Sequence, residues 1–472
     1  MEKKVLTQVS PVVLPWRVKI LYAAGSFSKA LLAVAAFMLY FYTDVCGIDS
    51  TVAATIILIA KIWDIINDPM MGAIIDRTRS KEGKCRFWLK YMSVPGMVIV
   101  ALCFFVPELT TTGKIIWVAV TYVLQGMIST SLLIPFNTMI SRLTSDERQR
   151  VQLTQADGIG QMLSQWMVVS LTFTFVGWLG GGDTRKGFLY VGIIYGIIYG
   201  IGHLIVYFAT KGYEPVEHSA EPAESVKERT GSALKDIISS MGAFYRNKVL
   251  MFCGAVAFLY TLGMAVEEGA MAWYFQYVKT DAEALYGIYG TMSMPVAIVI
   301  YLFLDKIVKK LGNARTVIAG SCFTLAGYAL GFVTHDATKA IMMIRWFLEG
   351  IGAGLIGAVI LLCVFDSKTY GVWKNNDNDS DAILTASYSL SYKIGMAIGG
   401  PILGYVLAFV PYEAGAAVQP ESACNLFFYE STLIPGLIYV ATLIFALLMR
   451  KYEKRIPQMQ KEIEERKQKQ NA

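Results

Sequence analysis

The feature that most constrains how this chain can fold is a series of long apolar segments along its whole length. Two examples are "ALLAVAAFMLYFY" (Ala30–Tyr42) and "LIPGLIYVATLIFALLM" (Leu433–Met449). A helix needs about 20 apolar residues to cross the ~30 Å of hydrocarbon in a bilayer, and here 55% of the residues are hydrophobic against 17% charged. Such segments are predicted near residues 18–43, 52–76, 88–107, 115–141, 152–178, 188–210, 249–278, 285–305, 315–334, 340–365, 383–410 and 427–450. The sequence therefore predicts an all-α membrane protein with twelve transmembrane helices.

Basic residues alternate between successive loops. The loop Asp76–Lys90 carries six of them, whereas the preceding loop, Asp44–Ser50, carries none. Because cytoplasmic loops are enriched in Lys and Arg, we expect the loops after even-numbered spans, and both termini, to face the cytoplasm. The polar N-terminus has no signal-peptide cleavage pattern, so the first span is expected to be retained as signal and anchor. The expected location is a bacterial plasma (inner) membrane, crossed many times.

A polar central segment, residues 211–248, divides the chain into two sets of six spans, residues 1–210 and 249–450, followed by a tail, 451–472. Apolar residues at helical spacing between Leu234 and Tyr245 predict an amphipathic helix in this linker. It is expected either to lie on the cytoplasmic membrane surface or to pack under the bundle.

An internal repeat supports this division. The loop "DRTRSKEGKCR" (Asp76–Arg86) and the loop "DKIVKKLGNAR" (Asp305–Arg315) align without a gap at equivalent places in the two halves. Aligned pairs include Asp76 with Asp305, Arg77 with Lys306, Gly83 with Gly312, and Arg86 with Arg315. Two six-helix halves that face each other across a central cavity form the major facilitator plan, and G-x-x-x-D-R at Gly72–Arg77 resembles that superfamily's signature. These loops are expected to determine topology and to clamp helices in the outward-facing state.

Ionisable side chains within the apolar segments point to the functional site, because each costs about 2.5–3.5 kcal/mol to insert. Counting 1.5 Å per residue from the predicted span ends places five polar side chains about 12–18 Å deep. They are Lys29, Asp64, Asp68, Thr130 and Lys393. They come from four helices and both halves, so we expect them to converge near mid-membrane.

Asp64 and Asp68 lie one helical turn apart on one face. Two close carboxylates repel unless a cation lies between them or one is protonated. Together with Asn67 and Thr130 they offer the oxygen ligands that a hard monovalent cation needs. We predict a coupling-cation site here for Na+, Li+ or H+. The alternative is that the aspartates pair with Lys29, Lys61 or Lys393 and hold helices together.

The motif "IWDIINDPMMGAIIDRTRSKEGKCRFW" (Ile62–Trp88) resembles the helix 2 and loop 2–3 signature of the glycoside–pentoside–hexuronide:cation symporters. Supporting segments are "LYFYTDVCG", "IPFNTM", "ERQRVQL" and "YKIGMAIGGPILGY", so the resemblance covers nearly the whole chain. It implies that the family's cation ligands correspond to Asp64, Asn67, Asp68 and Thr130, and that its span 11 lysine corresponds to Lys393.

The sugar-binding positions of the melibiose type are not kept. Ala30 follows Lys29 where that type has an aspartate, Asn137 ends "LIPFN" where it has tryptophan, and Gly158 takes the place of its span 5 arginine. The changes suggest a different cargo. Loss of carboxylates beside Lys29 and Lys393 makes the cavity more positive, which would suit a hexuronide.

Two adjacent glutamates in span 7, Glu267 and Glu268, argue against an anionic substrate. We expect Glu268, rather than Glu267, to face the cavity and to hydrogen-bond sugar hydroxyls. In span 10 we expect Arg345 to form an ion pair with Glu349. The predicted substrate ligands are thus Lys29, Asn137, Glu268 and Lys393.

The sequence therefore predicts cation-coupled symport of a glycoside, pentoside or hexuronide into the cell by alternating access. No nucleophile–base set or nucleotide loop indicates catalysis, and the seven cysteines form no CxxC pair. The expected partners are a sugar, a monovalent cation and the bilayer, with no cofactor and no nucleic acid, and the chain is expected to be monomeric. Two alternatives are a transporter of an amphiphile such as a lysolipid, and a membrane sensor that moves nothing.

Overall fold

The computed structural model describes residues 14–144, 146–214, 242–375 and 381–471. Within these ranges the secondary structure is entirely helical, and twelve helices are long and apolar enough to cross a membrane. The predicted all-α class and the twelve spans are confirmed. The amphipathic helix predicted for Leu234–Tyr245 falls, apart from its last residues, outside the described part of the chain.

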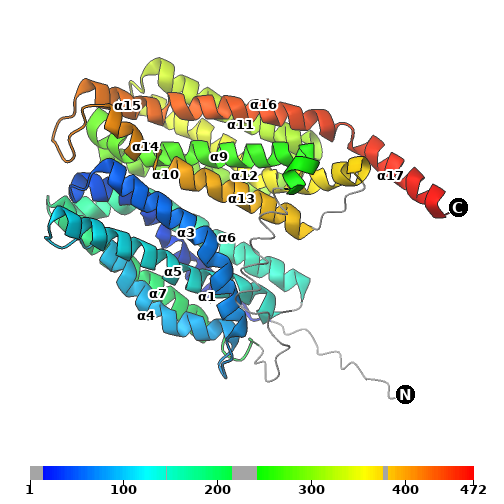
Figure 1. The fold of residues 1–472 in the computed structure, drawn as a ribbon, viewed down its shortest axis with the longest axis horizontal. Helices are drawn as coiled ribbons and strands as arrows, with labels where there is room; N and C mark the ends of the chain where they lie inside the picture. The colour runs from blue at the N-terminus through cyan, green and yellow to red at the C-terminus, as the bar shows by residue number, and fades with distance from the viewer. Residues whose placement is uncertain (1–13, 145, 215–241, 376–380, 472) are drawn as a thin grey trace.

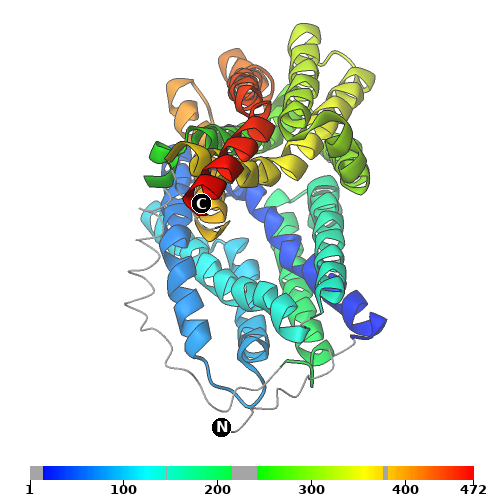
Figure 2. The ribbon, with the colours of Figure 1, turned by 90° about the vertical axis from the view of Figure 1, so that its right-hand side faces the viewer.

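The helices form two groups, one from each half of the chain (Figure 1). The N-terminal group contains α1 (Trp16–Ala30) with its continuation η1 (Leu31–Phe37), α2 (Met38–Tyr40) and η2 (Phe41–Val45), then α3 (Ser50–Arg77), α4 (Lys84–Cys103), α5 (Thr111–Leu143), α6 (Glu147–Gly180) and α7 (Thr184–Ala209). The C-terminal group contains α9 (Lys248–Trp273) with η3 (Tyr274–Val278), α10 (Ala282–Leu311), α11 (Asn313–Thr334), α12 (Lys339–Asn375), α13 (Asp381–Gly399) with α14 (Ile402–Val406) and η4 (Leu407–Phe409), α15 (Glu421–Ser431), α16 (Leu433–Glu453) and α17 (Ile456–Asn471). Figure 2, seen from the α17 side, shows the two groups facing each other.

The repeat predicted from the two loops has a structural counterpart in helix capping. The carboxylate of Glu214, just beyond α7, accepts hydrogen bonds from the backbone N–H of Cys85 (2.8 Å) and Arg86 (3.0 Å) at the start of α4. In the other half, Glu453 at the end of α16 accepts from the N–H of Ala314 (2.9 Å) at the start of α11. A carboxylate at a helix N-terminus satisfies backbone donors that have no helical partner and complements the helix dipole.

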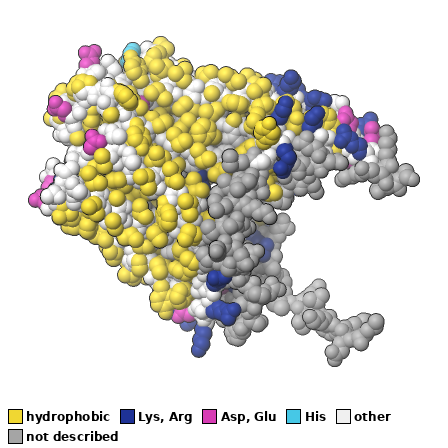
Figure 3. All heavy atoms as spheres, viewed as in Figure 1, with side chains coloured by type: hydrophobic (Ala, Val, Ile, Leu, Met, Phe, Trp, Pro, Cys, Tyr) yellow, Lys and Arg dark blue, Asp and Glu magenta, His cyan; other side chains and the backbone are white. Residues whose placement is uncertain are grey.

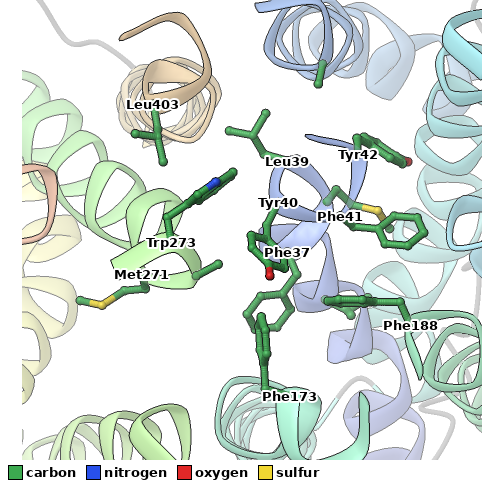
Figure 4. Close-up of a cluster of buried hydrophobic side chains, with 14 of the residues drawn as sticks. Phe37, Leu39, Tyr40, Phe41, Tyr42, Phe173, Phe188, Met271, Trp273 and Leu403 are labelled. Atoms are coloured by element: carbon green, nitrogen blue, oxygen red, sulfur yellow. The ribbon is translucent and has the colours of Figure 1, made fainter. Parts of the chain in front are cut away.

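The two halves meet through an aromatic cluster at one end of the molecule, which we call the Asp44 end. Phe37 and Phe173 pack on Tyr286, the latter stacked with ring centroids 4.8 Å apart, and Tyr40 packs edge-on against Trp273 at 5.3 Å. Figure 4 shows Trp273 approaching Tyr40 from the opposite half. Close aromatic packing of this kind holds the halves together at the Asp44 end.

At the opposite end the two groups of helices diverge (Figure 1). This end carries α17, and Lys and Arg side chains gather there in the view of Figure 3. Along the rest of the visible face hydrophobic side chains predominate, as expected for a surface in contact with lipid. We call this divergent end the basic end.

Candidate functional site

A cavity of about 320 Å³ lies between the two halves. Its polar lining comes from α3, α5, α6, α9, α10 and α13, as Lys61, Tyr122, Gln165, Glu268, Tyr286, Tyr289 and Tyr392. A second cavity of about 210 Å³, lined mostly by the C-terminal half, adjoins it, because both are lined by Gln165, Met264, Glu268 and Tyr289. Together they have the size and mixed apolar–polar lining of a small-molecule site.

Asp68 of α3 connects the two halves. Thr130 Oγ1 of α5 donates a hydrogen bond to Asp68 Oδ1 (3.0 Å), and Lys393 Nζ of α13 donates to Asp68 Oδ2 (2.7 Å). The side chains of Asp68 and Lys393 are 31% and 48% exposed. Water can therefore reach this pair, which keeps the bond exchangeable.

Asp64 lies one turn along the same helix, in a different setting. Its Oδ2 is 3.9 Å from Lys61 Nζ, and its Oδ1 faces Gly126 of α5 so closely that a Cβ there would lie 2.6 Å from it. Asn67 is 2% exposed, and its Nδ2 has no hydrogen-bond partner among the described residues. The structure thus places the carboxylates of Asp64 and Asp68 against α5, with Thr130 and Lys393 hydrogen-bonded to Asp68. That Asp64, Asn67, Asp68 and Thr130 bind a cation stays a prediction.

Lys29 belongs to a buried network that sequence reasoning missed. Its Nζ is 2.8 Å from Asp157 Oδ1 of α6 and donates to Asn137 Oδ1 (3.0 Å). Ser26 Oγ (2.6 Å) and Gln161 Nε2 (2.7 Å) also donate to Asp157. The signal was present in the sequence, since Asp157 lies in a predicted apolar span where a carboxylate is as costly as at Asp64.

These pairings overturn the argument that two lysines make the cavity positive. Lys29 is ion-paired with Asp157 and Lys393 with Asp68, so each lysine is neutralised by an aspartate. Over the described residues, the lining of the two cavities includes Glu268 but not Lys29, Asn137 or Lys393. Of the four predicted sugar ligands, all of which lie within the described residues, only Glu268 lines either cavity.

The adjacent glutamates of α9 point in different directions. Glu268 lines both cavities, whereas Glu267 lines only the smaller of the two. Glu267 is 5% exposed, accepts a hydrogen bond from Tyr328 OH (2.6 Å) and lies 3.5 Å from Arg345. The Arg345–Glu349 pair is present, with Nε 2.8 Å from Oε1.

The predicted loop residues make contacts within their own halves. Asp76 Oδ1 is 3.4 Å from Lys84 Nζ, and Arg86 donates to the backbone carbonyls of Glu82 and Tyr207. The matched glycines both have positive φ, 102° at Gly83 and 83° at Gly312, a conformation that favours glycine.

In the second loop the Lys306 Nζ lies 5.4 Å from the centre of the Phe303 ring, and Arg315 is exposed. The side chain of Asp305 is outside the described part of the structure. The gating role of these loops, with that of Arg77, stays a prediction.

Comparisons with known proteins agree with this architecture. The family model described as "MFS/sugar transport protein" matches residues 21–453. The isoprimeverose transporter of Lactiplantibacillus pentosus is 28% identical over 464 residues, which covers 97% of this chain and 93% of that protein. The putative glycoside/cation symporter YagG of Escherichia coli (strain K12) is 24% identical, with 90% and 89% covered. The crystal structure of the nucleoside transporter NupG superposes with a TM-score of 0.61 at 15% identity, covering 93% of this chain and 99% of that one.

The chain therefore belongs to the MFS/sugar transport family, and its fold is that of the major facilitator superfamily. Within the superfamily it is a member of the glycoside–pentoside–hexuronide:cation symporters, as the span 2 motif predicted. It is a multi-pass membrane transporter of sugars rather than an enzyme.

Proposed function

We propose that this protein imports a neutral glycoside together with a monovalent cation. The observation that carries the proposal is the central cavity, whose charged lining residues are Lys61 and Glu268 and whose other polar lining residues are four tyrosines and Gln165. Such a lining offers many hydrogen-bond donors and acceptors but no excess of positive charge. A sugar with a carboxylate would meet one cation in this described lining, Lys61, because Lys29 and Lys393 already have carboxylate partners. Lys61 Nζ itself lies beside Asp64 Oδ2 (3.9 Å) and is opposite in charge to Glu268.

Asp64, Asn67, Asp68 and Thr130 are the proposed cation ligands. A cation bound there would compete with Lys393 Nζ for Asp68 Oδ2, the atom that now accepts at 2.7 Å. Asp68 belongs to the N-terminal half and Lys393 to the C-terminal half. Ion binding would therefore replace the Asp68–Lys393 contact, which joins the halves, by a contact between Asp68 and the ion, which lies within the N-terminal half. Occupancy of the ion site is thereby linked to how the halves are arranged, and through the cavity to sugar affinity.

The positive-inside rule supports an inward-facing assignment of this conformation. The Asp44 end is closed by packing between the halves, and the basic end, where they diverge, carries the Lys- and Arg-rich loops. On this assignment both termini lie in the cytoplasm of a bacterium, and the cavity between the halves opens toward it.

Uptake into proteoliposomes tests the proposal. Wild-type protein should accumulate a labelled neutral glycoside when an inward sodium or proton gradient is applied, and neutral glycosides should compete better than glucuronides. Asp64→Asn combined with Asp68→Asn should reduce gradient-driven accumulation at least roughly tenfold, a loss of about 1.4 kcal/mol of coupling. Glu108→Gln, an exposed carboxylate at the Asp44 end, is the matched control and should behave as wild type.

Accumulation that keeps its gradient dependence in the double aspartate variant would overturn the cation site. Stronger competition by glucuronides than by neutral glycosides would overturn the substrate class. Sugar binding that never leads to accumulation would instead indicate a sensor, and uptake that only lysolipids compete for would indicate an amphiphile transporter.

A further inference from the structure

A cluster of charged side chains is buried in the C-terminal half, away from the proposed sodium or proton ligands of α3 and α5. Arg345 of α12 is 0% exposed and lies at its centre. Its Nε is 2.8 Å from Glu349 Oε1, its Nη1 2.6 Å from Asp336 Oδ2, and its Nη2 3.5 Å from Glu267 Oε1. One guanidinium is thus shared by three carboxylates.

The charges in this cluster do not balance. Near its edge Lys279 Nζ donates to the backbone carbonyls of His335 (2.9 Å) and Asp336 (2.8 Å). Even when Lys279 is counted with Arg345, the described residues of the cluster are three carboxylates against two cations, which leaves one negative charge in excess. The three carboxylates are 1–6% exposed, and an uncompensated charge so deeply buried is strongly unfavourable.

The hydrogen-bond donors are also too few. Within the described structure Glu349 Oε2 and Asp336 Oδ1 are buried and accept no hydrogen bond. Thr324 Oγ1, 2% exposed, has no partner and lines the same cavity as Glu267 and Glu349. The carboxyl groups of Glu267 and Glu349 lie within hydrogen-bonding reach of each other. Two carboxylates are stable in such an arrangement when one of them carries a proton.

We propose that Glu267 and Glu349 form a proton-binding site in which the two carboxyl groups share one proton. The proton supplies the missing positive charge and makes one carboxyl group a donor to the other. A metal ion fits less well, because Arg345 already takes the central position and no group of three or more His, Cys, Asp or Glu among the described residues is arranged to hold one.

The proton has a route from the central cavity. Glu267 and Glu349 line the 210 Å³ cavity, which shares Glu268 and Tyr289 with the larger cavity between the halves. A proton from cavity water can therefore reach the pair without crossing the apolar core. The titratable and charged groups that face it from the surrounding elements are Tyr260 and Glu268 (α9), Tyr274 (η3), Tyr289 (α10), Tyr328 (α11), Asp336, Arg345 and Tyr439 (α16).

This site differs from the proposed cation site in position and chemistry. It lies in the C-terminal half, next to Glu268 of the cavity, and it binds a proton only. The proposed cation site of α3 and α5, by contrast, offers oxygen ligands for a metal ion or a proton. Its existence does not depend on the identity of the sugar or of the coupling ion.

Infrared spectroscopy of the purified full-length protein without sugar tests the inference, because a protonated carboxyl group has its own C=O stretching band. Glu267→Gln and Glu349→Gln should each remove the intensity of one carboxylic acid. The double variant should remove no more than either single one, since the two residues share one proton. Glu430→Gln is the control, because Glu430 is another buried carboxyl group and accepts no hydrogen bond from the described residues. The carboxylic acid lost in Glu430→Gln should add to the one lost in either variant.

Loss of two carboxylic acids in the double variant would show two independently protonated glutamates and overturn the shared site. No loss in any of the variants would show that the pair is ionised and overturn proton binding altogether. Glutamine has the shape of a protonated glutamate, so the variants are expected to stay monodisperse. If one does not, the remaining single variant and the wild-type spectrum still decide whether the pair holds a proton.

Discussion

At the scale of single residues, the charges inside the membrane are satisfied in pairs and networks. Lys29 and Asp157 are 6% and 13% exposed, and Ser26, Asn137 and Gln161 complete the hydrogen bonding around them. A buried ion pair adds little net stability compared with an apolar pair, but the loss of one partner leaves an unpaired charge. The stability of the N-terminal half should therefore depend strongly on keeping both members of this pair.

Asp157→Asn should destabilise the protein by about 3–5 kcal/mol, because it leaves the Lys29 ammonium buried without a carboxylate. A thermal unfolding series in detergent measures the effect. Adding Lys29→Met to Asp157→Asn should restore most of the lost stability, since the unpaired charge is then gone. An unchanged unfolding midpoint in Asp157→Asn would show that Lys29 does not depend on this partner.

At the scale of elements, the breaks within spans place side chains at the contact between halves. Span 1 departs from α-helical geometry at η1 and η2, and span 7 departs from it at η3. Span 11 is interrupted at Pro401, which has no backbone N–H to donate to a helical hydrogen bond. Asp44 of η2 accepts hydrogen bonds from Tyr277 OH of η3 and from Tyr412 OH (2.5 Å), which follows η4. These bonds connect the N-terminal half to the C-terminal half at the Asp44 end.

Tyr412→Phe should shift the population toward a state open at the Asp44 end. A hydrogen bond to a charged group contributes about 1.5–3 kcal/mol, so the ratio of the two states should change roughly tenfold or more. Spin-label distances between Thr112→Cys and Ala337→Cys, in a background without the seven native cysteines, report the change as a larger long-distance population. Tyr429→Phe, on an exposed side chain, is the control. Equal distance distributions for both variants would show that the Tyr412–Asp44 hydrogen bond does not hold the halves together at the Asp44 end.

At the scale of the whole molecule, the Asp68–Lys393 pair joins the proposed ion site of one half to the other half. The pair is partly exposed, and pairs of this kind contribute about 0.2–1 kcal/mol. This modest strength suits a contact that has to form and break during each transport cycle, since a pair that was buried and dry would hold the halves in one arrangement.

Lys393→Met should raise the affinity for the coupling cation roughly two- to fivefold, because the cation no longer competes with an ammonium group for Asp68. Stabilisation of the protein against heat by increasing cation concentration measures the affinity through linkage. Lys451→Met, at an exposed position in the last turn of α16, should leave it unchanged. A lower or equal affinity in Lys393→Met would show that the lysine does not compete for the site.

Much of this protein could be predicted from its sequence, because the cost of exposing polar groups to hydrocarbon acts residue by residue along the chain. That cost determined the twelve spans, and the same per-residue argument led to Asp64 and Asp68. The sequence repeat around Gly83 and Gly312 likewise follows from local requirements, since each precedes the start of a helix and has a positive φ.

The partners of the buried charges were decided by the tertiary structure alone. Whether Lys29 pairs with Asp64 or with Asp157, and whether Lys393 lines the cavity or contacts Asp68, depends on how helices distant in sequence are rotated and tilted against each other. Those rotations follow from side-chain packing summed over whole helix faces, which no short stretch of sequence encodes. The net charge of the cavity lining therefore depends on how the two halves are assembled. The proposed preference for a neutral over an acidic sugar depends on that charge.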